Sequence, residues 1–288
     1  MAEEALRQAA PSCRLSIKLA SQAPVAVLLR REPTGWAQMI KWNTANDTFE
    51  CGQWFRGRIY ADMSDLSDDG ELLLYVARKG GARTLAEVGS DTWTALSRPP
   101  FFTALALWPH DGLCGGGIFT GHREVQLDIP ATKLQAHADH LPRGVSVQTH
   151  DGPHGVWMAA QKALRSDWQC IASEDEHDPL GDFSHPKTVG NGAIRLLSHA
   201  RSEKQPRRAA RTVESFVVSN VHGDTEIGAA DFADFDQRQR LVFSRNGQLF
   251  VCDQPSAATL EWRMLADFSE MRPQRVEPSN WARDWPSS

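Results

Sequence analysis

The sequence lacks any segment suited to a membrane or to export. Its longest apolar run, residues 101–108, is too short to span a bilayer. The first residues, MAEEALRQAAPSC, are acidic and have no apolar core, which argues against a signal peptide. We therefore expect a cytoplasmic protein that does not bind membranes.

Cysteine is scarce and irregularly spaced. The five cysteines are an odd number and never form a Cys-x-x-Cys pair. This arrangement favours reduced thiols over a disulfide framework, which agrees with an intracellular location.

The common catalytic motifs are missing as well. The glycine-rich stretch at residues 110–117 has no Walker lysine, and Thr120 stands where a Gly-x-Gly-x-x-Gly motif needs its third glycine. There is no Gly-x-Ser-x-Gly and no His-Glu-x-x-His. We interpret the glycines as a bend before a strand at residues 118–120, and we expect no cofactor.

The composition is that of a soluble globular protein with many tryptophans. The chain has 288 residues, of which 41% are hydrophobic and 23% charged, so it is long enough for a sizeable core. Its ten tryptophans supply much area for burial. The net charge of −5 argues against a nucleic-acid partner.

Two segments have the pattern of β-hairpins. In residues 52–79 a strand ending near Tyr60 is followed by a polar turn containing Asp69-Gly70 and by the apolar run 72–77. In residues 236–253 the dipeptide Asn246-Gly247 separates two short apolar runs, which is a strong hairpin signal.

Further strands are expected along most of the chain. Apolar and polar residues alternate over residues 14–20, as in a half-buried strand. Other strand-like segments lie at residues 24–31, 35–42, 48–51, 92–96, 101–108, 212–219 and 257–265. We predict an all-β fold, a β-propeller-like array of antiparallel meanders with five or six irregular blades. A β-sandwich is the alternative.

The rest of the chain divides into an extension, one helix and two loops. Residues 1–13 are predicted to form an N-terminal extension, and residues 14–288 a single domain. One short helix is expected at residues 153–168, where apolar residues recur at spacings of three and four. Long polar loops are expected at residues 130–155 and 173–211.

Two patterns raise the question of a metal site. The region 130–155 contains four histidines, namely His137, His140, His150 and His154. The segment Asp65-x-Ser67-x-Asp69-Gly70 is similar to the start of a calcium-binding loop, but its twelfth position is Val76 where a glutamate is needed. We interpret both patterns as loop residues and predict no metal.

Residues 64–79, SDLSDDGELLLYVARK, resemble the Ser-Pro-Asp-Gly strands of WD-type propellers, with Asp68 where those repeats carry proline. Residues 240–253 resemble a second blade hairpin. The segments GQWFRGRIY, TWTALSRPPFFTALALWP and GGGIF are similar to a family of uncharacterised bacterial proteins over roughly residues 14–119. This resemblance implies a propeller-like fold and carries no activity.

The leading functional hypothesis is a non-enzymatic scaffold or binding protein whose partner is another protein. Tryptophan and arginine contribute strongly to interfaces. The candidate binding residues are Trp36, Trp42, Trp54, Arg56, Arg58 and Trp93. Each of them is also compatible with ordinary packing in a sheet.

A hydrolase with a polar site in a central cleft or channel is the alternative. Its candidate residues are Asp62, Asp65, His110, Asp111, His150, Asp151 and His154. A bacterial immunity protein that neutralises a toxin is a third hypothesis, suggested by the bacterial resemblance and the acidic charge.

Overall fold

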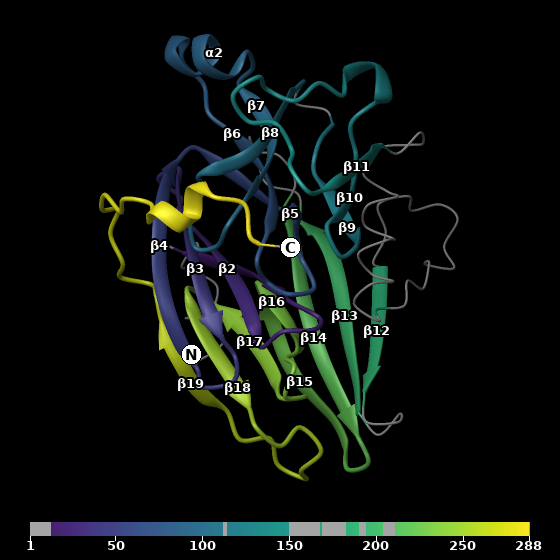
Figure 1. Ribbon diagram of the computed structural model, residues 1–288. Coiled ribbons are helices and arrows are strands. Elements are labelled where there is room, and N and C mark those ends of the chain that lie inside the picture. The colour runs from purple at the N-terminus through teal and green to yellow at the C-terminus, as the bar shows by residue number, and fades with distance from the viewer. Residues whose placement is uncertain are drawn as a thin grey trace.

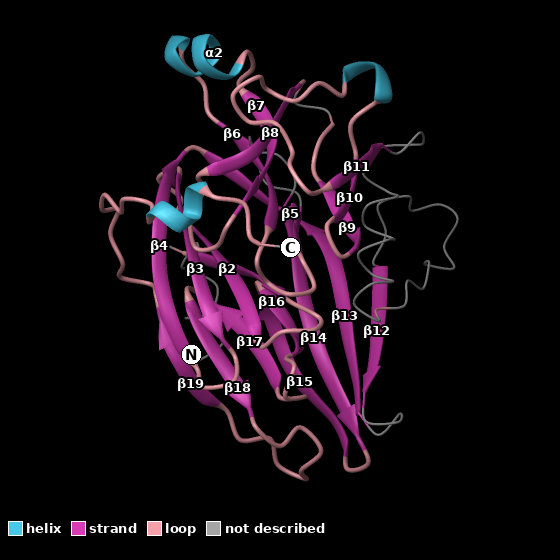
Figure 2. Cartoon of the chain, viewed as in Figure 1, coloured by secondary structure: helices cyan, strands magenta, loops and turns pink. Residues whose placement is uncertain are grey.

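The chain folds into five consecutive β-sheets. A computed structural model describes residues 13–111, 114–149, 168, 183–189, 194–203 and 211–287. The sheets follow one another along the chain, and strands dominate the secondary structure (Figure 1, Figure 2). The prediction of an all-β protein is confirmed.

Each sheet is built from strands that are consecutive in the sequence. The first sheet contains β1 Arg14–Leu19, β2 Val25–Arg31, β3 Trp36–Asn43 and β4 Thr48–Arg56. The second contains β5 Arg58–Leu66, β6 Leu73–Arg78, β7 Thr92–Ser97 and β8 Ala104–His110. The third contains β9 Gly117–Gly121, β10 Glu124–Leu127 and β11 Ser146–Thr149. The fourth contains β12 Phe183–Val189, β13 Ile194–Glu203, β14 Arg211–Asn220 and β15 Gly223–Ala230. The fifth contains β16 Phe232–Phe235, β17 Leu241–Arg245, β18 Gln248–Cys252 and β19 Arg263–Asp267.

Neighbouring strands run antiparallel, as expected for meanders. The exception is the pair β10 and β11, which is parallel. Because each meander reverses at every turn, the start of β1, the end of β2 and the start of β3 lie at one end of the first sheet. The end of β1 and the start of β2 lie at the other end.

Local turn chemistry places the Asp69-Gly70 and Asn246-Gly247 turns of the two predicted hairpins correctly. Gly70 has φ 71°, and Asp69 accepts hydrogen bonds from the Ser67 hydroxyl at 2.5 Å and the Glu71 amide at 2.9 Å. Asn246 and Gly247 have φ angles of 52° and 80°, which the β17–β18 turn requires. These positive φ values are tolerated by asparagine and glycine, so the residue types determine where the chain reverses.

Successive residues of β2 pack on opposite sides of the first sheet. Val27 and Leu29 belong to a core shared with the second sheet. Ala26 and Leu28 belong to a core shared with the fifth sheet. Side chains alternate between the two faces of a strand, so the continuous apolar run of β2 is explained by a sheet that is covered on both faces.

The second and fifth sheets are covered on both faces in the same way. In β6, Leu73 and Tyr75 face the first sheet, whereas Leu74 packs in a core with the third sheet. In β17, Val242 packs with the first sheet, whereas Phe243 packs in a core with the fourth sheet. Four apolar cores therefore join the sheets in the order third, second, first, fifth and fourth.

The strand predicted to end near Tyr60 is two strands in different sheets. β4 ends at Arg56 and β5 begins at Arg58, with Gly57 between them. The Gly57 amide donates to the Gly35 carbonyl at 2.9 Å, and a Cβ at Gly57 would lie 2.6 Å from the Arg78 carbonyl oxygen. Because glycine has no side chain, the chain can cross from the first sheet to the second close to the Arg78 backbone. The residues around Gly57 do not reveal this change of sheet.

Three other predicted boundaries are wrong. The segment 173–211, predicted as a loop, contains β12, β13 and the first residue of β14, because backbone pairing with neighbouring strands overrides its polar composition. The predicted loop 130–155 contains β11 and the short 3-10 helix η1 Ala131–Lys133. The strand expected at residues 257–265 is β19, which begins only at Arg263.

The α-helix of the described residues is α2, Ala82–Val88, which the sequence did not predict. It begins after Gly81 without a side-chain cap and ends at Gly89. The helix predicted at residues 153–168 lies outside the described residues except for Trp168, which pairs with Lys187 in an isolated bridge. The chain also has the 3-10 helix η2, Asn280–Arg283, and no described helix is long and apolar enough to cross a membrane.

Candidate functional site

The first strands of several sheets lie side by side and surround a cavity. β1 contacts β5 and β16, and β5 contacts β9. A cavity of about 360 Å³ lies among the ends of β1, β5 and β16 and the side chain of Lys187 on β12. Four of the five sheets therefore contribute to one cavity, and this cavity is the candidate ligand site.

The cavity lining mixes charged, polar and aromatic groups. Charged and polar lining residues are Lys18, Ser21, Asp65, Lys187, Asp234, Asp236 and Gln237. Aromatic lining residues are Trp168, Phe232 and Phe235. Such a lining offers hydrogen bonds and an apolar surface to a small polar molecule.

Asp234 is fixed by three donors at the cavity wall. Its carboxylate accepts hydrogen bonds from the Lys187 ammonium at 2.6 Å, the Trp168 indole at 3.1 Å and the Phe235 amide at 2.7 Å. The side chains of Lys187 and Asp234 are only 11% and 9% exposed. A carboxylate held in this way maintains the shape and charge of the wall and has little freedom to move a proton.

Gln237 connects the fifth sheet to the first sheet beside the cavity. Its amide nitrogen donates to the carbonyls of Ala20 at 2.6 Å and Val25 at 3.1 Å. Its amide oxygen accepts a hydrogen bond from the Thr44 hydroxyl at 2.9 Å. The turn after β16 is therefore fixed against the β1–β2 hairpin, and these contacts hold the residues at the edge of the cavity in place.

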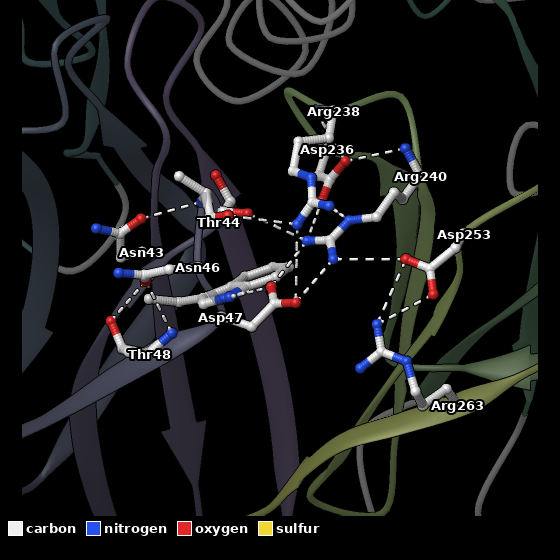
Figure 3. A network of polar contacts seen from close by, with 12 residues as sticks. Asn43, Thr44, Asn46, Asp47, Thr48, Asp236, Arg238, Arg240, Asp253 and Arg263 are labelled. Atoms are coloured by element: carbon white, nitrogen blue, oxygen red, sulfur yellow. Dashed lines mark hydrogen bonds and ion pairs between the residues drawn. The ribbon is translucent and has the colours of Figure 1, made fainter.

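Arg240 is the centre of a second connection between these sheets (Figure 3). Its guanidinium donates to both carboxylate oxygens of Asp47 at 2.8 Å and to Asp236 at 2.8 Å. The side chains of Arg240 and Asp236 are 3% and 0% exposed. Asp253 lies 3.6 Å from the same guanidinium. Three carboxylates, two of them hydrogen-bonded, thus share one buried cation, and the geometry is that of a structural ion-pair network.

The network changes the acidity of Asp47. Burial raises the pKa of this carboxyl, but the hydrogen bond and the charge of Arg240 lower it more, so its pKa lies below the ordinary value. A folded-state pKa below the unfolded one contributes stability that is present above the unfolded pKa of about 4 and is lost as the pH falls through the folded pKa.

We therefore expect Asp47→Asn to weaken the dependence of the unfolding free energy on pH under acidic conditions. Urea unfolding of the natural protein should show a free energy that falls as the pH drops below about 4. The variant should be less stable at neutral pH and should lose less on acidification. Equal pH slopes for the two proteins below this value would contradict the role given to Asp47.

Charged residues of the first, second and fourth sheets also influence one another. The Glu214 side chain is open to solvent but has protein on several sides. This partial loss of water, followed by the negative charge of Asp62, raises the pKa of Glu214, and Lys18 partly offsets the increase. Groups from β14, β5 and β1 thus influence one another electrostatically, although they belong to three different sheets.

The predicted polar cluster does not form one site among the described residues. Asp65 lines the cavity and accepts the Phe119 amide at 2.8 Å, whereas Asp62 is an exposed residue of the same strand. His110 is buried at the end of β8, where one ring nitrogen lies 3.0 Å from the Thr94 hydroxyl. Burial lowers the pKa of His110, and a hydrogen bond to the Asp111 carbonyl partly offsets the decrease.

The other members of that cluster are also separate from the cavity or fall outside the description. Asp111 is exposed and forms an ion pair with Lys133. The remaining three, His150, Asp151 and His154, lie outside the described residues. The hydrolase hypothesis grouped His110 and Asp111 with the others by residue type. In the structure these two residues lie at the end of β8, and neither lines the cavity.

Two of the predicted binding tryptophans are core residues. Trp42 is 0% exposed in the core between the first and fifth sheets, and it stacks on Phe49 with ring centroids 5.8 Å apart. Trp93 is buried in the core between the first and second sheets. Both strands are covered on the face that carries the tryptophan, so neither side chain is available to a partner.

The other four predicted binding residues lie at or near the surface. Trp36 and Trp54 are half-buried, and Arg30 lies over the Trp54 ring at 5.1 Å. Arg56 and Arg58 are exposed at the junction of the first two sheets. These arginines and Trp36 remain candidates for an interface.

No metal site is found in the described part of the chain. No group of three or more His, Cys, Asp or Glu side chains there is placed to hold an ion. His137 and His140 contact each other, and the His137 ring donates to the Glu87 carbonyl at 2.9 Å. Asp69 is occupied in the hairpin turn rather than in a calcium loop.

Several residues of the cavity were not identified from the sequence. The alternation in residues 14–20 places Lys18 away from the core, but it does not reveal that this side faces a cavity. Lys187 and Asp234 come from strands far apart in the chain, and no local motif marks either of them. Comparison of the chain with models of known protein families and with characterised proteins gives no match.

Proposed function

We propose that the five sheets form a closed ring of the β-propeller type. Four apolar cores already join them in an unbroken series, and the first strands β16, β1, β5 and β9 are neighbours. In the proposal, the third and fourth sheets meet to complete the circle. A two-layer β-sandwich agrees less well with these contacts, because three of the sheets are covered on both faces.

We infer that the protein is a non-enzymatic binding protein that recognises a small polar ligand at the centre of this ring. The observation that carries the inference is the cavity of about 360 Å³ to which four sheets contribute. Its volume is within the range of small-molecule sites, roughly 300–1,000 Å³. Two of its carboxylates, those of Asp234 and Asp236, are held by Lys187 and Arg240. The walls are therefore suited to recognition by fixed groups.

Catalysis and toxin neutralisation are supported less well. A hydrolase needs a general acid or base free to exchange protons, and of the four described members of the polar cluster only Asp65 lines the cavity. The immunity-protein hypothesis depends on a resemblance and on charge alone. Both stay predictions from the sequence.

Filling the mouth of the cavity tests the proposal. Ser21 is exposed at the end of β1, lines the cavity and donates to Asp68 at 2.7 Å. We expect Ser21→Trp to abolish a ligand-induced rise in melting temperature, whereas Ser21→Ala, which removes only the hydrogen bond, should retain it. A panel of amino acids, monosaccharides and small carboxylic acids, measured by thermal shift, supplies the ligands. Equal responses from both variants would place the ligand elsewhere.

A further inference from the structure

A group of arginines lies at the strand ends opposite the cavity. Arg14 and Arg31 are directly paired in register between β1 and β2, and Arg58 and Arg78 are directly paired between β5 and β6. β1 is six residues long, which places its two ends about 17 Å apart. The arginines are therefore distinct from the cavity, which lies at the other ends of β1 and β5.

The arginines differ in the counter-charges available to them. Arg14 lies 3.7 Å from a carboxylate oxygen of Asp231, and Arg78 lies 3.0 Å from Asp91. Within the described ranges, no acidic side chain forms an ion pair with Arg31, Arg56 or Arg58, which are all exposed. Of the nearby carboxylates, Glu32 pairs with Arg30 at 2.7 Å, and the exposed Asp62 supplies part of a counter-charge to Arg31.

Neighbouring positive charges contribute to a lowered pKa at Arg31. Protein on several sides of this exposed side chain removes part of its water and lowers the pKa most, the guanidinium groups of Arg58 and Arg14 lower it further, and Asp62 and Tyr60 partly offset the decrease. Like charges placed directly opposite each other in a sheet are destabilising. An anionic partner would remove this cost, because it would supply the missing negative charge.

Aromatic rings lie beside the arginines. The Arg58 guanidinium lies over the Tyr60 ring at 4.6 Å, and Trp36 is directly paired with Arg56 across β3 and β4. The Gly57 amide, which donates to Gly35, brings the turn before Trp36 next to these arginines. Tyrosine, tryptophan and arginine are the residue types that contribute most to protein interfaces. We use the name arginine patch for Arg31, Trp36, Arg56, Arg58 and Tyr60, which lie at the same end of the first two sheets. By register, Trp36 and Arg56 lie on the opposite face of the first sheet from Arg31, so the patch extends around the end of that sheet.

We propose that the arginine patch is a docking site for an acidic segment of a partner protein. Planar guanidinium groups bind carboxylates with two parallel hydrogen bonds, and the two rings supply apolar contact for neighbouring side chains. A protein segment fits better than a nucleic acid because the whole chain carries a net charge of −5, which repels a long polyanion. The patch binds its partner independently of the cavity ligand.

The test measures binding of a fluorescein-labelled octaglutamate peptide by fluorescence polarisation. We expect binding at about 50 mM NaCl that weakens at about 300 mM, because salt screens exposed charges. The variant Arg31→Glu with Arg58→Glu should bind the peptide roughly tenfold more weakly or worse. The milder pair Arg31→Gln with Arg58→Gln should give an intermediate loss.

A matched control separates the patch from net charge. Arg143→Glu with Arg263→Glu changes the total charge equally at two exposed arginines outside the patch, and it should bind like the natural protein. Melting temperatures establish that every variant is folded. The proposal is overturned if the natural protein does not bind the peptide, or if the control loses as much affinity as the patch variant. Tighter, patch-dependent binding of a single-stranded oligonucleotide of the same charge would also overturn it and assign the patch to nucleic acid.

Discussion

Replacing Arg240 by methionine should destabilise the protein by about 3–5 kcal/mol. The substitution keeps much of the aliphatic volume but removes the cation that Asp47 and Asp236 share. Asp236 is 0% exposed, so its charge would be left buried with backbone donors alone. The cost of an uncompensated buried charge exceeds the modest value of the ion pair itself. Urea unfolding followed by circular dichroism measures the difference.

Arg263 provides the matched control for this experiment. It lies at the exposed edge of the same network, where it pairs with Asp253 at 3.0 Å, and Asp253 lies 3.6 Å from Arg240. The side chains of Arg263 and Asp253 are 53% and 48% exposed. Arg263→Met should therefore cost less than about 1 kcal/mol. Adding Asp236→Asn to Arg240→Met should restore part of the loss, because the second change removes the unpaired charge. Similar losses for the two single variants would mean that the buried network has no special role.

The position of Arg240 also explains why the network matters for the fold. Its partners Asp47 and Asp236 belong to the turns of the first and fifth sheets, which are far apart in the chain. Arg240 (Figure 3) and Gln237 both join the first sheet of the chain to the last one. Loss of this contact should therefore affect the cavity, because Asp236 and Gln237 in the turn after β16 line it.

Features set by local chemistry were predictable from the sequence, whereas features set by distant contacts were not. The Asp69-Gly70 and Asn246-Gly247 turns depend on residues next to one another, and both were located correctly. The break at Gly57 depends on Arg78 and Phe55 lying within 3.0 Å of where its Cβ would be. No pattern within residues 52–60 contains that information.

The candidate site illustrates the same limit. A cavity formed by β1, β5, β12 and β16 brings together residues separated by more than a hundred positions, such as Lys18 and Lys187. The sequence grouped Asp65 with His110 because both seemed suited to proton transfer. In the structure Asp65 faces the cavity, and His110 is buried beside Thr94. The residue types suggested acid–base catalysis, but the pairing of strands determines which side chains lie close together.

Trp42→Ala should destabilise the fold by about 3–5 kcal/mol, although the sequence suggested Trp42 for partner binding. The ring is 0% exposed, packs among residues of the first and fifth sheets, and donates its indole N–H to Asp47 at 3.3 Å. Truncation would leave a large cavity in this core and would remove a donor from the carboxylate that Arg240 also holds. Thermal and urea unfolding should both register the loss.

Trp36→Ala is the comparison that separates packing from binding for these tryptophans. Trp36 is half-buried at the start of β3, within the arginine patch, so its removal should cost at most about 1 kcal/mol of stability. It should instead weaken octaglutamate binding, because the ring lies beside Arg56. A stable Trp42→Ala protein that has lost peptide binding would reverse these assignments. Conversely, a Trp36→Ala protein that unfolds would show that Trp36, like Trp42, belongs to the core.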